Sequence, residues 1–179
     1  MTLSPSLVLR SDGSSTPAEV CAEIAHVFGV RTTEVGLLQL KGKALIFLFP
    51  AELRAAGSIP LSNSAIAART AVSRKAEIFN DFAKIKHGTV FERIKIGNEA
   101  NDNSRSIQKL MSAPIIATDG TLLGVLQISR KGLTRAAAGP DFESQDLRKL
   151  ESLASELAAF MPYMADNKTA KGRLTFLTG

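Results

Sequence analysis

The stretch Pro-Ile-Ile-Ala-Thr-Asp-Gly-Thr-Leu-Leu-Gly-Val-Leu-Gln-Ile-Ser-Arg-Lys, residues 114–131, decides the fold. It places Asp119-Gly120 between two runs of alternating residues, which is the strongest hairpin signal that a short sequence offers. A basic loop follows, and Phe142 then opens a segment with apolar residues at helical spacing that extends to Met161. The sequence therefore predicts an antiparallel hairpin followed by a long helix.

Length and composition predict one globular domain. The 179 residues and the 45% hydrophobic content suffice for a core of useful size. The single cysteine, Cys21, excludes a disulfide within the chain and has no His or Cys neighbour at metal-binding spacing. We find no apolar run near the roughly 18 residues of a membrane span and no basic region ahead of the first apolar residues. We therefore expect a soluble, cytoplasmic protein without a signal peptide or a membrane partner.

The net charge of +5 is concentrated in the middle of the chain. Residues 61–140 carry twelve basic and six acidic side chains, whereas the flanking parts are close to balanced. Such a surplus can surround an anion pocket, contact nucleic acid or form an ordinary solvated surface. The aromatic content of 6% and the lack of a known motif count against nucleic acid.

The rest of the chain predicts an α+β order of elements. Thr16-Pro17-Ala18-Glu19 is a capping box with proline at the first helical position, and Gly29 is placed to end that helix. The expected elements that follow are a hairpin of strands 34–40 and 44–49 around Lys41-Gly42-Lys43, a helical turn at 51–56, a helix from Asn63 or Ser64 to Val72, a strand at 77–79, an irregular basic segment at 84–103, and a strand or helix end at 107–111. Helices at both ends of an antiparallel sheet indicate an α+β domain.

Over roughly residues 16–161 the chain resembles the GAF domain family. The matching pieces, in order, are residues 68–81, 111–115 and 124–128, and Phe142 with its helix. The resemblance implies a central antiparallel sheet of about six strands with the terminal helices on one face. The irregular middle would roof the other face and enclose a small-molecule cup. The expected boundaries are 1–15 for an N-terminal arm, 16–165 for the GAF-like domain and 166–179 for a C-terminal tail.

The strand predicted at Leu122–Arg130 has two different faces, because side chains alternate along a strand. The two sets are Leu122, Leu126 and Ile128 on one face, and Leu123, Val125, Gln127 and Ser129 on the other. The first set suits helix packing, and the second is apolar at one end and polar at the other, as a ligand-facing surface should be. Gln127 then either contacts the ligand or satisfies a buried backbone group.

A second part of the resemblance concerns the junction between this strand and the last helix. Members of the family that bind cyclic nucleotides carry an Asn-Lys pair at the strand end and Phe-x-x-x-Asp-Glu at the helix start. The corresponding residues here are Ser129, Arg130, Phe142, Asp146 and Leu147, of which Phe142 and Asp146 match. The resemblance implies that Arg130 pairs with Asp146 and clamps the strand to the helix, a structural role worth about 0–1 kcal/mol if exposed.

The segment that would roof the cup supplies most of the candidate ligand-binding residues. Arginine binds phosphate or carboxylate through paired hydrogen bonds, and aromatic rings stack on planar groups. These residue types favour an anionic or aromatic ligand, such as a cyclic nucleotide or a small acid. Together with Gln127, the candidates are Phe79, Asn80, Asp81, Phe82, Phe91, Arg93, Lys95, Ser104 and Arg105. For each of them, an ordinary core or surface position is the alternative.

The sequence offers no convincing catalytic, cofactor or metal site. The methionine-sulfoxide-reducing members of the family use several cysteines, and Cys21 alone cannot carry out that exchange. A bilin-binding member needs an attachment cysteine in the pocket. His26 falls in the first helix and His87 in the irregular segment, and neither has a second metal ligand at suitable spacing. We therefore expect no enzyme activity and no cofactor.

The last helix carries a broad apolar stripe. Its members are Leu147, Leu150, Ala154, Leu157 and Met161 at spacings of three and four, with Leu153 and Phe160 beside them. Packing on one sheet face needs a narrower stripe, so either a second subunit or the N-terminal helix covers the excess.

Together these features predict a non-catalytic sensory or regulatory module that binds a small ligand. It would signal through a homodimer formed by the terminal helices or through a partner signalling protein. The alternative is a protein-interaction or dimerisation module with a collapsed pocket and no ligand.

Overall fold

The computed structural model describes residue 7, residues 15–85 and residues 106–164. The helices are α1 (Pro17–Phe28), α2 (Ala51–Arg54), α3 (Ile66–Ser73), α5 (Ser144–Ala158) and α6 (Met161–Met164), with 3₁₀ turns η1 (Thr32–Glu34) and η2 (Phe82–Lys84). The strands are β1 (Val35–Lys41), β2 (Ala44–Phe49), β3 (Ser58–Pro60), β4 (Glu77–Phe79), β5 (Ser106–Ile116) and β6 (Leu122–Gly132). None of the helices described is long and apolar enough to cross a membrane.

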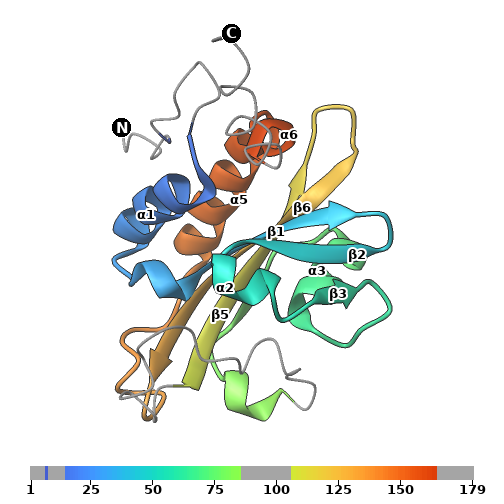
Figure 1. The fold of residues 1–179 in the computed structure, drawn as a ribbon. Helices are drawn as coiled ribbons and strands as arrows, with labels where there is room; N and C mark the ends of the chain where they lie inside the picture. The colour runs from blue at the N-terminus through green and yellow to red at the C-terminus, as the bar shows by residue number, and fades with distance from the viewer. Residues whose placement is uncertain (1–6, 8–14, 86–105, 165–179) are drawn as a thin grey trace, which may run out of the picture.

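The six strands form one antiparallel sheet in the order β3-β2-β1-β6-β5-β4. Helices α1 and α5 pack together on one face, and α2 and α3 lie on the other (Figure 1). The longest strands, β5 and β6, have 11 residues each and form the hairpin predicted around Asp119-Gly120. The predicted α+β fold with a six-stranded antiparallel sheet is confirmed.

Local signals form the elements where the sequence places them. The Thr16 hydroxyl accepts a hydrogen bond from the Glu19 backbone N–H, and the Glu19 carboxylate accepts one from the Thr16 N–H. Gly29 ends α1 in the left-handed region at φ +59°, which costs glycine little. At the β5–β6 turn, Gly120 has φ +86° and the Asp119 carboxylate accepts from the Thr121 N–H. The capping box, the C-terminal glycine cap and the hairpin turn are all confirmed.

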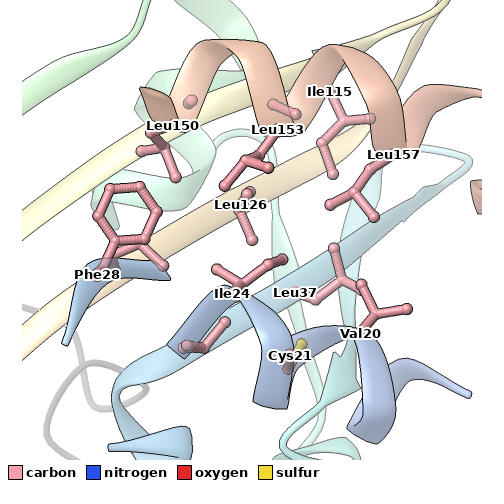
Figure 2. Packing of buried hydrophobic residues seen from close by; sticks show 14 of the residues in the cluster. Val20, Cys21, Ile24, Phe28, Leu37, Ile115, Leu126, Leu150, Leu153 and Leu157 are labelled. Carbon is pink, nitrogen blue, oxygen red and sulfur yellow. The ribbon is translucent and has the colours of Figure 1, made fainter. Parts of the chain in front are cut away.

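The larger core lies between the sheet and the two terminal helices. Figure 2 shows Leu150, Leu153 and Leu157 of α5 directed toward Leu126 of β6, with Ile24 of α1 facing the same cluster. These five side chains have no exposed surface. Most of the apolar stripe of α5 is thus buried within one chain against the sheet and α1, while Leu147 and Phe160 are only partly buried.

The strand β6 contains a β-bulge that changes one prediction. Ile115 pairs with Gly124 whereas Ile116 pairs with Leu122, so Leu123 is the extra residue. The extra residue shifts the alternation, and Leu122 packs with the cluster on the α3 face while Leu123 packs with the helix-side core. The expected faces of these two leucines were therefore wrong, because the sequence does not show where a bulge falls.

Candidate functional site

A pocket lies on the sheet face opposite α1 and α5. Its cavity volume is about 60 Å³, and it widens toward solvent at an open mouth. Its walls come from the start of β1, from β2 and β3, from α2 and α3, and from one face of β5 and β6. The lining residues are Thr33, Glu34, Val35, Gly36, Phe47, Pro50, Leu53, Ile59, Ala67, Ile107, Leu110, Gln127, Ser129 and Lys131. Most of these side chains are apolar, and the polar ones belong to β6 and to the η1 turn beside it.

Gly36 helps to keep this space open. A Cβ built on Gly36 would lie 3.7 Å from the Cβ of Gln127 and 3.9 Å from a ring carbon of Phe47, which are ordinary contacts. The position therefore tolerates a side chain, and that side chain would grow from β1 into the pocket.

The Glu34 carboxylate lies at the polar end of the pocket, and both of its oxygens accept hydrogen bonds from neighbouring groups. It is 7% exposed and accepts hydrogen bonds from the backbone N–H groups of Arg31 at 2.8 Å and Lys131 at 2.6 Å. The Arg31 guanidinium adds an ion pair at 3.2 Å. The Ser129 hydroxyl donates to the Glu34 carbonyl at 3.1 Å. These contacts hold the start of β1 against the end of β6 and fix that end of the pocket. The three-residue spacing from Arg31 to Glu34 was a readable local signal.

Gln127 is held by a buried polar chain that crosses from β6 to α3. Its side-chain nitrogen donates to the Ser112 hydroxyl at 3.2 Å, and the Ser112 and Thr70 hydroxyls lie 2.7 Å apart. The Thr70 hydroxyl also lies 2.9 Å from the Ile66 carbonyl, to which it donates. Ser112 and Thr70 are completely buried, and Gln127 is 8% exposed. The prediction that Gln127 faces the pocket side of the sheet agrees with this geometry, while its partners Ser112 and Thr70 went unrecognised because they are distant in sequence.

The aromatic candidates Phe79 and Phe82 pack beside the pocket without lining it. They belong to a small cluster with Ile66 and Leu110, of which Leu110 also lines the pocket. The Arg69 guanidinium lies 5.6 Å from the centre of the Phe79 ring. In the described residues, both phenylalanines thus support a pocket wall.

The polar candidates Asn80 and Asp81 hold other parts of the chain. The Asn80 amide donates to the Phe142 carbonyl and accepts from the Phe142 N–H, both at 2.9 Å. Asp81 pairs with Lys84 at 2.7 Å and lies 3.8 Å from Arg135. Neither residue lines the pocket described above.

The remaining candidates fall outside the described residues. They are Phe91, Arg93, Lys95, Ser104 and Arg105. Their assignment to a ligand site stays a prediction from the sequence, as does the expected irregular roof.

The clamp at the junction of β6 and α5 is made by different contacts from those expected. The Arg130 guanidinium lies 4.6 Å from the centre of the Phe142 ring and donates to the Pro140 carbonyl at 2.9 Å. Asp146 instead accepts from the Glu143 N–H at 2.9 Å and lies 4.0 Å from Lys149. Among the described residues, the ion pair of Arg130 with Asp146 is not formed, because Asp146 caps its own helix. The cation–π contact still joins strand to helix.

A buried lysine that sequence reasoning missed reinforces this junction. Lys109 of β5 is 3% exposed, and its ammonium group pairs with Asp141 at 2.8 Å and donates to the Gly139 carbonyl. Hydrogen bonds from Lys109, and then from Arg135, hold the pKa of the Asp141 carboxyl below its ordinary value. Nothing local marks Lys109, since it stands among apolar strand residues.

The described residues do not show a metal or thiol site at the pocket. In the ranges 15–85 and 106–164 no three His, Cys, Asp or Glu side chains converge as metal ligands would. Cys21 is completely buried in the helix-side core, on the opposite face of the sheet (Figure 2). Burial raises the pKa of its thiol far above the ordinary value, so the reactive thiolate is scarce.

Comparison with known proteins agrees with this architecture. The family described as GAF domain matches residues 16–160. Among solved structures, the GAF domain of an Acinetobacter phosphoenolpyruvate-protein phosphotransferase superimposes with a TM-score of 0.60 at 11% identity, covering 88% of this chain and 90% of that one. The free methionine-R-sulfoxide reductase from Neisseria meningitidis, solved with its substrate, gives 0.57 at 17% identity, covering 84% and 78%. A putative GAF sensor protein from Burkholderia vietnamiensis gives 0.54 at 18% identity, covering 86% and 89%. Among curated proteins, none matches the chain.

Proposed function

The chain belongs to the GAF domain family, a sensory or regulatory fold, and on that basis we propose that it is a non-catalytic cytoplasmic module that binds a small ligand. The ligand would occupy the pocket between α2, α3 and the sheet. The observation that carries this proposal is the pocket itself: apolar walls meet a few fixed polar groups at one end. The alternative, a protein-interaction or dimerisation module with a collapsed pocket, predicts instead that no small molecule binds there.

The pocket walls support a ligand with an apolar or aromatic body. Phe47, Leu53 and Ile59 offer flat or branched apolar surfaces, and Gln127 and Ser129 stand opposite them on β6. The further prediction of an anionic group, as in a cyclic nucleotide or small acid, depends on Arg93, Lys95 and Arg105 outside the described residues.

A catalytic role like that of the Neisseria reductase is not part of the proposal. The likeness at 17% identity extends to the fold alone. The single cysteine of the chain is buried in the helix-side core, away from the pocket and with a raised pKa. We expect no reduction of free methionine-R-sulfoxide above the rate of reductant alone, and turnover that is lost in a Cys21→Ser variant would contradict us.

Thermal shift measurements test ligand binding. The probes are cyclic nucleotides, nucleobases, aromatic amides and small carboxylic acids, each titrated into the wild type and into Gly36→Leu. At least one class should raise the melting temperature of the wild type with increasing concentration, since a ligand that binds the folded state stabilises it. Gly36→Leu should fold and lose that shift because its side chain fills the pocket. If no probe acts on the wild type, or if both proteins respond equally, the pocket is not the ligand site.

For the output we propose a homodimer or a partner signalling protein that contacts the outer side of the terminal helices. Tyr163 of α6 is 65% exposed, and Leu147 and Phe160 are only partly covered by the core. Leu147 lies in the first turn of α5, and Phe160 and Tyr163 lie beyond its end, so the exposed apolar area is smaller than the sequence suggested. Light scattering with and without a Tyr163→Glu change tests self-association, and a monomer at all concentrations would leave the partner protein as the route.

A further inference from the structure

We infer that Gln127 presents its side-chain carbonyl oxygen to the pocket as a fixed hydrogen-bond acceptor, so that the site selects small apolar ligands carrying an N–H or O–H donor. This inference rests on the proposed ligand-binding function. It adds a hydrogen-bond donor to the apolar or aromatic body of the proposed ligand.

The direction of the buried polar chain sets the orientation of the Gln127 amide. The Thr70 hydroxyl has one proton and two acceptors within reach, the Ile66 carbonyl at 2.9 Å and the Ser112 hydroxyl at 2.7 Å. We assign its proton to the Ile66 carbonyl, which is the contact that a helical threonine makes with the carbonyl four residues before it. With this assignment the Ser112 hydroxyl gives its own single proton to Thr70. Ser112 is left with lone pairs facing Gln127, which are satisfied only by the N–H group of the amide at 3.2 Å.

The reversed amide is disfavoured for the same reason. Turning the Gln127 side chain over would set its carbonyl oxygen against the Ser112 oxygen, and neither atom would have a proton to share. Because this contact is buried, an unsatisfied pair of acceptors costs more there than at the surface. The nitrogen therefore stays on Ser112, and the oxygen lies on the other side of the amide. Among the described residues that oxygen has no hydrogen-bond partner, and Gln127 lines the pocket.

The neighbouring polar groups present acceptors as well. The Ser129 hydroxyl uses its proton on the Glu34 carbonyl, so its lone pairs remain. The Glu34 carboxylate accepts from Arg31 and Lys131. The lining residues that carry other donor groups, Thr33 and Lys131, lie in the η1 turn and near the end of β6. A ligand with a donor is thus matched by Gln127, whereas a ligand with only an acceptor leaves the amide oxygen unsatisfied.

A matched pair of probes tests the selection. Indole and benzofuran share one bicyclic shape, but indole carries an N–H where benzofuran carries an ether oxygen. Each is titrated into the wild type, Ser112→Ala and Gln127→Met while the backbone amide signals of Gly36, Leu53 and Ala67 are followed by NMR. We expect indole to bind the wild type about tenfold more tightly than benzofuran. In both variants the affinities for indole and benzofuran should lie within about threefold of each other. Ser112→Ala leaves the Gln127 amide free to turn over, and Gln127→Met removes the amide oxygen.

A second measurement examines the amide without any ligand. The side-chain NH₂ protons of Gln127 should exchange with solvent more slowly than those of the exposed Gln145, and Ser112→Ala should abolish the difference. Equal exchange at Gln127 and Gln145 in the wild type would overturn the inference by itself.

The outcomes of the titration separate the two proposals. Equal binding of indole and benzofuran at the pocket overturns the donor selection and leaves ligand binding standing. No response of the pocket signals to either probe counts against the proposed function, and the amide exchange then decides the orientation of Gln127 independently.

Discussion

Asn80 shows how single polar side chains hold distant parts of this chain together. Its amide makes both a donor and an acceptor contact with the backbone of Phe142, 62 residues away, and so joins the end of β4 to the start of α5. Gln127 does the same between β6 and β5, and Lys109 between β5 and the loop before α5. At this scale, these polar residues hold one part of the described chain to another, and of the predicted candidates within the described residues only Gln127 also lines the pocket.

Replacing Asn80 should cost more than replacing its neighbour Asp81. Asn80→Ala leaves two partly buried backbone groups of Phe142 without partners, and we expect a loss of about 1–3 kcal/mol in the free energy of unfolding. Asp81→Ala removes ion pairs whose partners, Lys84 and Arg135, are well exposed, and should cost about 0–1 kcal/mol. Urea unfolding of both variants gives the comparison. Equal losses would show that the Asn80 contacts contribute no more than a surface ion pair.

Asp141 should make stability depend on pH in the acid range. Its pKa is lowered in the folded state by Lys109 and then by Arg135, so the carboxylate stabilises the fold above the unfolded pKa of about 3.9. That contribution is lost as the pH falls through the lower, folded value. We expect wild type and Asp141→Asn to differ at pH 7 and to converge below about pH 4. A difference that persists unchanged in acid, measured by urea unfolding at each pH, would contradict the assignment.

At the scale of elements, the helices, the hairpins and their caps follow from signals within a few residues. The capping box at Thr16 and the turn at Asp119-Gly120 need no distant partner, and both were predicted. The β-bulge at Leu123 depends on how β5 pairs with β6, and the bond network of Gln127 depends on Ser112 and Thr70. Tertiary packing sets the register of strand pairing and the hydrogen-bond partners that are distant in sequence. The sequence could therefore predict that a pocket lies on this face of the sheet, but not which polar groups line it.

Gly124 is the position at which the close approach of β1 and β6 demands glycine. A Cβ there would lie 2.0 Å from the Leu38 carbonyl oxygen, a backbone atom that cannot turn aside. Gly124→Ala should therefore lower the free energy of unfolding by about 3 kcal/mol or more, or prevent folding altogether. Gly36→Ala is the matched control on the neighbouring strand, with its nearest contact at 3.7 Å, and should fold with stability unchanged or slightly raised. Circular dichroism and urea unfolding separate the two. A Gly124→Ala protein as stable as Gly36→Ala would show that the strands can move apart freely.

At the scale of the whole molecule, the two faces of the sheet share their central strands. Leu126 and Ile128 of β6 enter the helix-side core, while Val125 and Gln127 of the same strand face α3 and the pocket. A ligand that fixes β6 from one side therefore acts on a strand whose other face belongs to the core shared with α1 and α5. The reach of such an effect depends on whether the helices on the two faces separate from the sheet in one cooperative step or independently.

The rate at which a thiol reagent labels Cys21 tests this point, because Cys21 of α1 is completely buried in the helix-side core. A thiol reagent reaches it after α1 leaves the sheet or after the chain unfolds, and its raised pKa keeps the thiolate scarce in the folded state. We expect labelling by an aromatic disulfide in native buffer to be at least ~1,000-fold slower than in unfolding concentrations of urea. If all helices leave the sheet in one unfolding step, the labelling rate rises steeply even at low urea concentrations. The slope of that rise reflects the surface exposed on unfolding. Rapid labelling that does not vary with low urea would show instead that α1 detaches alone from the rest of the fold.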